Sequence, residues 1–351
     1  MADDSRICST CVFARPSDIS KHGIERTQYE EGGSDTAYGI EFVGAFLASL
    51  FVTFFLLPWL IPRLKQKGIV GRDLNKPDKP EIAEMGGIAV VVGFLAGVSA
   101  IIALDGITDE DLLIASLSAI MGAAFVGMID DLFDLPQGFK ALLPFVIALP
   151  FATAVSQEVV IPHVAIINLG PWMVLAAAFA MTCAANAANM LEGFNGLGTG
   201  LGIVMSFTLL VLSIIHDRLD GIYVLVPLIG ALVAFLWFNK HPAEVFPGDT
   251  MTLFMGATLA AAGLLSSLHV QTAVIFLPMI IEFALKVRGR FSAENYAQRS
   301  ANGLLIYQGK IESLTHVFMR YFKVSEQTLV YWIWTIEVAI CAIVIAVDLS
   351  L

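Results

Sequence analysis

Long apolar runs alternate with short polar segments along most of the chain. Each run is close to the roughly 20 residues that an α-helix needs to cross the hydrocarbon core of a bilayer. The pattern therefore predicts an all-α, polytopic integral membrane protein with about ten transmembrane helices. The expected spans are 38–61, 86–104, 111–129, 140–155, 171–189, 198–215, 222–239, 251–268, 270–287 and 327–348.

Two regions lie outside this regular alternation. Residues 1–37 are polar and lack the apolar core of a signal peptide, so we expect an N-terminal tail ahead of a membrane domain at 38–351. The ninth loop between spans, 288–326, is the longest. Within it, apolar residues at helical spacing over 311–322 predict a short helix lying in the membrane interface.

Lysine and arginine residues gather in alternate loops. Of the 20 in the chain, 15 belong to the odd-numbered loops when Lys140 and Lys286, at the ends of their spans, are counted with the adjoining loop. One (Arg218) lies in an even-numbered loop, and four lie in the tail. Loops rich in Lys and Arg remain in the cytoplasm. We therefore expect the odd loops to be cytoplasmic and both termini to lie outside.

Composition excludes several classes of protein. With 57% hydrophobic and 15% charged residues, the chain is unlike a soluble domain. A formal net charge of −11 argues against nucleic acid as a partner. Cys8 and Cys11 form a lone C-x-x-C in the tail, a zinc half-site or a redox pair. Because no second pair completes a zinc site, we favour the absence of a metal there.

Three carboxylates stand where the third span leaves the membrane: Asp130, Asp131 and Asp134. Charged residues in or beside a span are costly and usually mark function. On a helix, the spacing of Asp131 and Asp134 places both on one face. A solvated helix end would explain one such residue, but three in five positions favour a metal or phosphate site.

Further polar clusters fall on the same side of the membrane. Asn186 and Asn189 share a helix face and precede a glycine-rich segment that ends at Gly200. Helix–helix hydrogen bonds and close packing would explain the amides and the glycines separately. Together they indicate a polar ligand that the backbone approaches closely. Asp249 stands just before an apolar run, which suits either a helix N-cap or a cation or phosphate site.

These clusters supply the groups that phosphoryl transfer requires. Carboxylate and amide oxygens suit Mg²⁺, and the arginines of the ninth loop suit a diphosphate or the anionic headgroups of lipids. A site at the bilayer surface suits one lipid reactant and one soluble reactant. A secondary transporter is the alternative from another class. It is disfavoured because we find no internal repeat and the polar groups lie at one face.

Five segments carry a resemblance to the polyprenyl-phosphate N-acetylhexosamine-1-phosphate transferase family. Within this family, the chain is most similar to the archaeal and eukaryotic UDP-GlcNAc:dolichyl-phosphate GlcNAc-1-phosphate transferases. The resemblance covers about 38–351, with ten spans as the family has. The matching segments are Gly71–Lys76, Glu84 with Gly86 and Gly87, Gly127–Leu135, Asn186–Leu197 and Phe246–Thr250.

The resemblance implies roles for individual residues. It implies Asn189 and Asp249 as ligands of Mg²⁺, with Mn²⁺ as the alternative ion, and Asp130 and Asp131 as paired catalytic aspartates beside Asp249. The implied substrate-binding residues are Glu84, Asp134, Lys140, Asn186, Asn195, Phe246, Arg288 and Arg290. Among these, Lys140 matches a phosphate-contacting lysine, and Asn195 and Phe246 match uridine-binding positions.

The implied reaction is transfer of GlcNAc-1-phosphate, or a related HexNAc-1-phosphate, from the UDP-sugar to a polyprenyl or dolichyl phosphate, with release of UMP. This would be the first membrane step of lipid-linked glycan assembly, and N-glycan assembly is favoured. The resemblance implies a transferase in the archaeal cell membrane, or in the ER membrane if the source is eukaryotic, with a cytoplasmic site; a homodimer is left open.

Two features of the ninth loop depart from the family pattern. Arg288-Gly-Arg290 lacks the His that separates the two arginines in the eukaryotic enzymes. The His-rich motif of the bacterial phospho-N-acetylmuramoyl-pentapeptide transferases, the second enzymatic alternative, is absent from this loop. The choice of sugar is therefore left open by the sequence.

Overall fold

The computed structural model describes residues 37–104, 109–162, 164–291, 295–296, 298–299 and 303–350. Tyr38–Leu351 forms one compact unit. The tail with Cys8 and Cys11 lies outside the described residues, so the expectations for it stay predictions. The unit consists mostly of helices, and its few strands are short.

The elements follow one another in the order of the expected spans. The helices are α1 (Ala37–Gln66), α2 (Gly87–Ala103), α3 (Glu110–Phe133), α4 (Gln137–Ala154), α5 (Trp172–Met190), α6 (Leu197–Ile215), α7 (Leu219–Asn239), α8 (Gly248–Leu265), α9 (His269–Ile275), α10 (Leu277–Arg288), α11 (Leu314–Tyr321) and α12 (Glu326–Ser350). The strands form three antiparallel hairpins: β1 (Val70–Arg72) with β2 (Glu81–Ala83), β3 (Glu158–Ile161) with β4 (Ala165–Asn168), and β5 (Gln298–Arg299) with β6 (Leu305–Ile306).

The expectation of a polytopic all-α membrane protein is confirmed. Within the described residues, eight helices are long and apolar enough to cross a membrane, and the pair α9 and α10, bent by 61°, makes a ninth if it is one span. Helix α2 is apolar but shorter, with 17 residues. The ten expected spans therefore correspond to eight long helices, one bent pair and one short helix.

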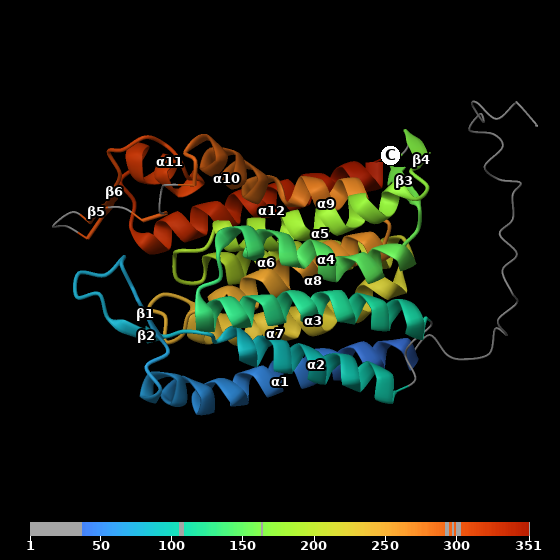
Figure 1. The fold of residues 1–351 in the computed structure, drawn as a ribbon, viewed down its shortest axis with the longest axis horizontal. Coiled ribbons are helices and arrows are strands. Elements are labelled where there is room, and N and C mark those ends of the chain that lie inside the picture. The colour runs from blue at the N-terminus through green and yellow to red at the C-terminus, as the bar shows by residue number, and fades with distance from the viewer. Residues whose placement is uncertain are drawn as a thin grey trace, which may run out of the picture. The chain divides into compact units, whose positions relative to one another are not determined.

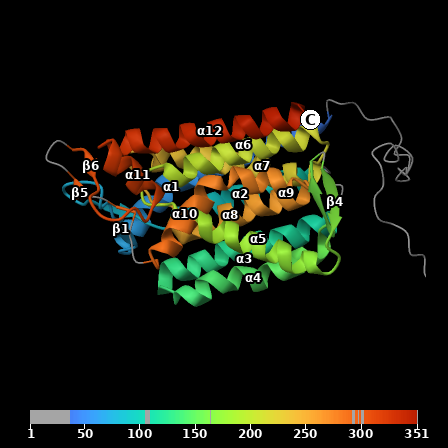
Figure 2. The same ribbon diagram turned by 90° about the horizontal axis from the view of Figure 1, so that it is seen from above.

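Helix α8 lies in the middle of the bundle (Figures 1 and 2). In its most apolar window 89% of the residues are buried, whereas the windows in α1 and α4 are 22% buried. Small residues allow neighbouring helices to approach α8 closely. A Cβ at Gly256, for example, would lie 2.4 Å from the carbonyl oxygen of Ala184 in α5. The outer helices instead expose large apolar side chains, as expected beside lipid.

The odd-numbered loops meet at one end of the bundle. This end, on the left in Figure 1, holds the β1–β2 hairpin, the start of α8 and the described part of the ninth loop, whereas β3, β4 and the end of α12 lie at the other. The helix expected at 311–322 is present as α11, in which Thr315, His316, Phe318 and Met319 are buried. We call the first end the polar end and the second the far end.

Candidate active site

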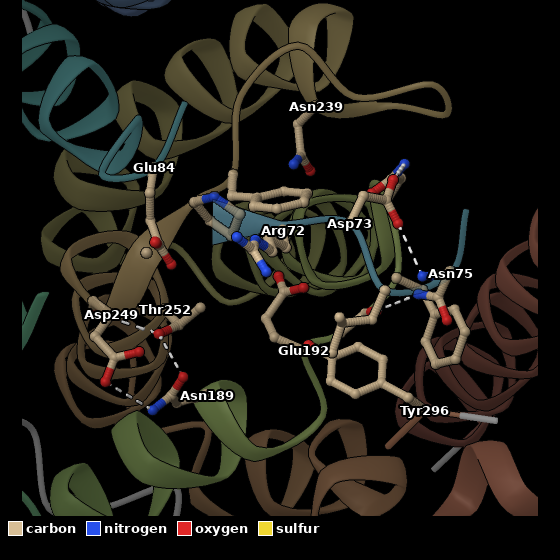
Figure 3. Close-up of a pocket in the computed structure, with 17 residues that line it drawn as sticks. Arg72, Asp73, Asn75, Glu84, Asn189, Glu192, Asn239, Asp249, Thr252 and Tyr296 are labelled. Carbon is tan, nitrogen blue, oxygen red and sulfur yellow. Dashed lines mark hydrogen bonds between the residues drawn. The ribbon is translucent and has the colours of Figure 1, made fainter. Parts of the chain in front are cut away.

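A cavity of about 260 Å³ opens at the polar end. Side chains from the first, fifth, seventh and ninth loops line it together with the start of α8 (Figure 3). The lining residues are Arg72, Asp73, Leu74, Asn75, Glu84, Asn189, Glu192, Gly193, Phe194, Asn195, Asn239, Phe246, Pro247, Gly248, Asp249, Thr252 and Tyr296. Segments far apart in the sequence thus form one polar concavity at the membrane face.

The end of α3 is bound to the start of α8 through Asp131. One carboxylate oxygen of Asp131 accepts a hydrogen bond from the backbone N–H of Asp249 (2.6 Å). The other accepts from the N–H and the hydroxyl of Thr250 (2.9 and 2.6 Å). The first N–H groups of a helix have no partner within the helix and carry partial positive charge, so a carboxylate satisfies them well. Asp131 is therefore the side chain that caps α8.

Asp249 itself is not the N-cap of α8. The capping position belongs to Pro247, and Asp249 lies in the first helical turn. Gly248 makes this arrangement possible, because it has φ +67° and a Cβ there would lie 2.5 Å from a carboxylate oxygen of Asp131. The simple capping interpretation of Asp249 is therefore wrong, and its side chain is directed elsewhere.

The side chain of Asp249 joins a small polar cluster. Its Oδ2 accepts a hydrogen bond from the amide of Asn189 (3.1 Å) and forms an ion pair with the ammonium of Lys140. The same ammonium lies 2.8 Å from Oδ2 of Asp130, whose Oδ1 accepts from the backbone N–H of Leu135. The structure thus brings together four of the residues predicted from sequence.

A second network forms the opposite wall of the cavity. The amide of Asn195, which is 5% exposed, donates to Asp73 (3.0 Å), and its backbone N–H donates to Glu326 at the start of α12 (3.1 Å). Lys76 bridges Asp73 and Glu326. Phe246 also lines the cavity and is held by its backbone N–H, which donates to the carbonyl of Ala83 (2.7 Å). These bonds fix the first, fifth and seventh loops relative to one another.

Two glutamates of the cavity have perturbed acidity. Burial raises the pKa of Glu192 to about 7, although hydrogen bonds from the backbone N–H groups of Gly193 and Gly198 oppose the shift. Burial also raises the pKa of Glu84, and the negative charges of Asp131 and Asp134 add to the effect. Perturbed carboxyls in a cavity are typical of functional sites.

Seven predicted site residues do not line the cavity. Asp130, Asp131 and Lys140 make the contacts described above, and the other four lie elsewhere. Asp134 ends α3 in the left-handed conformation with φ 49° and is exposed, so the expectation that it shares a helix face with Asp131 is wrong. Asn186 donates to the carbonyl of Thr182 in its own helix. Arg288 donates to the carbonyl of Ile311, and the side chain of Arg290 is exposed.

Several lining residues were not among the predicted site residues. Arg72, Asp73 and Asn75 belong to the segment Gly71–Lys76, which carried part of the family resemblance. Glu192 likewise stands within a matching segment. A sequence signal for these residues was therefore present, but only the tertiary structure, in which Asp73 accepts from Asn195 and Asn75 donates to Gly193, shows that this segment lines the cavity.

The donor atoms of the cavity fit a hard divalent cation. Asp249 offers a carboxylate, and Asp130 adds a second one through the shared Lys140. The amide oxygen of Asn189 accepts from the hydroxyl of Thr252 (3.1 Å), while its amide nitrogen donates to Asp249. The described residues contain no cluster of three His, Cys, Asp or Glu side chains that could hold a metal ion. Mg²⁺ needs only one or two carboxylates when phosphate and water supply its other ligands, so the two facts agree.

Comparison with known proteins gives consistent results. The family model described as glycosyl transferase family 4 matches residues 113–267. A putative UDP-N-acetylglucosamine–dolichyl-phosphate N-acetylglucosaminephosphotransferase of Saccharolobus solfataricus is 35% identical, with 85% of this chain and 94% of the relative covered. The UDP-N-acetylglucosamine–dolichyl-phosphate N-acetylglucosaminephosphotransferase of Schizosaccharomyces pombe is 28% identical over 77% and 72%. A phospho-N-acetylmuramoyl-pentapeptide-transferase of Rubrobacter xylanophilus is 29% identical over 54% and 63%.

Proposed function

The chain belongs to glycosyl transferase family 4 and is a membrane glycosyl-1-phosphate transferase, and we propose that it transfers GlcNAc-1-phosphate from UDP-GlcNAc to a polyprenyl or dolichyl phosphate. The relatives named after this activity support the choice of donor and acceptor. One observation of the structure carries the proposal. A single cavity at one end of the bundle is lined both by the Asp249–Asn189 pair and by Asn195 and Phe246.

In the proposed reaction, an oxygen of the lipid monophosphate forms a bond to the β-phosphorus of UDP-GlcNAc. The bond from that phosphorus to the bridging oxygen breaks, and UMP leaves with this oxygen. A phosphate monoester has its second pKa near 6, so most of the lipid is a dianion at neutral pH. A strong general base is therefore not required, and the protein mainly positions groups and neutralises charge.

The carboxylates have different parts in this proposal. Asp249 and Asn189 would hold Mg²⁺, which neutralises charge on the diphosphate and the leaving UMP when it is bound. The three hydrogen bonds to Asp131 support a positioning role, in which it fixes the start of α8 and hence Asp249. Asp130 holds Lys140 near the same carboxylate, and the ammonium is placed to contact a phosphate.

The remaining inferences concern location and pathway. The distribution of Lys and Arg supports a cytoplasmic polar end, and the archaeal relative supports a site on the inner face of an archaeal cell membrane. The product would be the first lipid-linked sugar of a glycan, with N-glycans as the proposed destination.

An assay of UMP release tests the proposal. We expect the purified protein in lipid nanodiscs to release UMP from UDP-GlcNAc only when polyprenyl phosphate is present, and to stop when EDTA removes divalent cations. UDP-GalNAc and UDP-MurNAc-pentapeptide serve as competing donors. Faster release from the pentapeptide donor would favour the bacterial type of reaction, which the Rubrobacter relative suggests. An absence of UMP with every donor would refute the proposal.

A further inference from the structure

Negative charge dominates the cavity. Among the lining residues that the structure describes, Arg72 is the one lysine or arginine, and it faces the carboxylates of Asp73, Glu84, Glu192 and Asp249. A nucleoside diphosphate carries at least two negative charges of its own. It can bind here only if cationic groups compensate for the repulsion between like charges.

Two of the four carboxylates already have a cationic partner. The ammonium of Lys76 lies 3.4 Å from Asp73, and that of Lys140 pairs with Asp249. Neither lysine lines the cavity. Arg72, by contrast, has no side-chain partner among the described residues. A guanidinium has five N–H donors, and no described residue engages those of Arg72.

Strand pairing holds the backbone of Arg72 in place, whereas no described residue bonds to its side chain. Arg72 pairs with Glu81 across the β1–β2 hairpin. The next residue, Asp73, is buried and accepts from Asn195 and from the backbone N–H of Asn75. Asn75 in turn donates to the carbonyl of Gly193 (2.8 Å). The hairpin is thus attached to the fifth loop through Asp73 and Asn75. This attachment does not use the guanidinium of Arg72.

Arg72 also lies between the two functional walls. Figure 3 shows its side chain in the middle of the cavity, with Glu84, Asp249 and Asn189 on one side and Asp73, Asn75 and Tyr296 on the other. A diphosphate that links a nucleoside on one wall to a cation on the other must cross this position. The arginines expected to contact the diphosphate, Arg288 and Arg290, do not line the cavity.

We propose that Arg72 is the residue of this chain that grips the diphosphate of the nucleotide donor. The inference rests on the proposed function, which supplies the nucleoside diphosphate. A guanidinium can hold two phosphate oxygens at once with a pair of parallel hydrogen bonds, which a lysine cannot do. Arg72 is therefore a specificity-determining residue for a diphosphate over an uncharged nucleoside.

Binding of uridine and of UDP to the full-length protein in nanodiscs, without lipid acceptor, tests this directly. Loss of a charge-assisted contact corresponds to about a ten- to hundredfold change in affinity. We expect Arg72→Gln to weaken UDP binding by about this factor and to leave uridine binding within about twofold. Arg72→Lys should restore only part of the loss, because it keeps the charge but not the bidentate geometry.

Arg218→Gln is the matched control, because it removes the same charge from an exposed arginine at the far end. We expect it to bind UDP as the wild type does. Without nucleotide, Arg72→Gln should melt at the wild-type temperature, since the side chain has no described partner to lose. Three results would overturn the proposal: unchanged UDP affinity of Arg72→Gln, equal losses for uridine and UDP, or a larger loss from Arg288→Ala and Arg290→Ala than from Arg72→Gln.

Transfer kinetics distinguish whether Arg72 contacts the diphosphate of the nucleotide donor or the phosphate of the lipid acceptor. We expect Arg72→Gln to raise KM for UDP-GlcNAc and to leave KM for the polyprenyl phosphate unchanged. A rise confined to the lipid substrate would assign Arg72 to the acceptor and refute the donor assignment. If the wild type binds UDP through Arg72 but transfers nothing to any lipid phosphate, the proposed function fails and the assignment of Arg72 stands.

Discussion

Both ends of the bundle contain a cavity with charged side chains, but these side chains are used differently. At the far end a cavity of about 200 Å³ contains Asp348, whose oxygens accept from His216 (2.7 Å) and Gln271 (2.8 Å). These bonds connect the end of α12 to the end of α6 and to α9. At the polar end, the carboxylate of Asp249 interacts with two side chains and still lines a larger cavity.

The difference is in how much of each carboxylate the fold itself uses. At the far end, each carboxylate oxygen of Asp348 has a partner within the fold. At the polar end, Asp131 takes over the capping of α8, which leaves the side chain of Asp249 free of that task. At the polar end Asp131 therefore caps the helix, and the neighbouring Asp249 can still bind a ligand.

The sidedness of the two ends is the sharpest test of this comparison. We expect single cysteines at Gly138 and at Val164 to react with a membrane-impermeant reagent from opposite sides of the membrane, in a background without the four native cysteines. A Cβ at Gly138 meets no atom within 4 Å, and Val164 is 79% exposed, so both positions are accessible. Labelling of both from one side would contradict the assignment of the ends.

Asp249→Asn should have the largest effect on activity. The change removes the charge and keeps the shape, so binding of a hard cation weakens while the fold is preserved. We expect transfer to fall by roughly a hundredfold or more, which corresponds to about 3 kcal/mol. The melting temperature without ligand should change little. Stabilisation by UDP-GlcNAc with Mg²⁺ should shrink, because it follows occupancy of the folded state.

The rate of UMP release and paired melting curves measure these effects. Asp249→Asn turning over at nearly the wild-type rate would remove Asp249 from the metal site.

Asp131→Ala should show the opposite pattern to Asp249→Asn, with its main effect on stability without ligand. Removing the carboxylate leaves the N–H groups of Asp249 and Thr250 and the hydroxyl of Thr250 without their acceptor. Unsatisfied buried donors are costly, so we expect a loss of about 2–4 kcal/mol in stability, read as a lower melting temperature without ligand. If Asp131→Ala were as stable as the wild type and inactive, the residue would act in the chemistry and not as the cap.

Glu192 links the polar end to pH. Its pKa is raised from the ordinary value near 4.5 to about 7, so the folded state holds the proton more tightly than the unfolded state does. The stabilisation from this group is complete below about pH 4.5 and is lost as pH rises through about 7. Glu192→Gln resembles the protonated form and cannot titrate. We therefore expect the variant to gain stability relative to the wild type between about pH 5 and about pH 8.

Melting curves of the two proteins over this range measure the difference. Glu84 remains in both, so its own raised pKa cancels. A constant difference in melting temperature across the range would show that Glu192 ionises normally.

Asp348→Asn should have the smallest effect and serves as the counterpart of Asp249→Asn at the far end. Asn can still accept from one partner, so we expect a loss of about 0.5–1.5 kcal/mol in stability. Transfer should stay within about twofold of the wild type, since a change of this size in a rate constant is under 1 kcal/mol. A loss of activity comparable to that of Asp249→Asn would mean that the far end takes part in function.

The sequence predicted the helices well because each span is a local pattern. The bounds of α3, α5, α7 and α8 follow the apolar runs within a few residues, except that α3 continues through Asp130 and Asp131 to Phe133. That extension could not be foreseen from hydropathy, because the two aspartates are stabilised by Lys140 and by the start of α8, which lie elsewhere in the chain.

The sequence by itself determined the membrane class, the order of the spans and the clustering of polar residues in the odd-numbered loops, because length, hydropathy and charge are properties of short segments. Only the tertiary structure decided which polar residues meet. It placed Asp249 beside Asn189 and Lys140, turned Arg72 into the cavity, and kept Asp134 and Asn186 out of its lining. The physical reason is that helix packing around α8 and the hairpin bonds of the first loop fix side-chain directions through contacts between residues far apart in sequence.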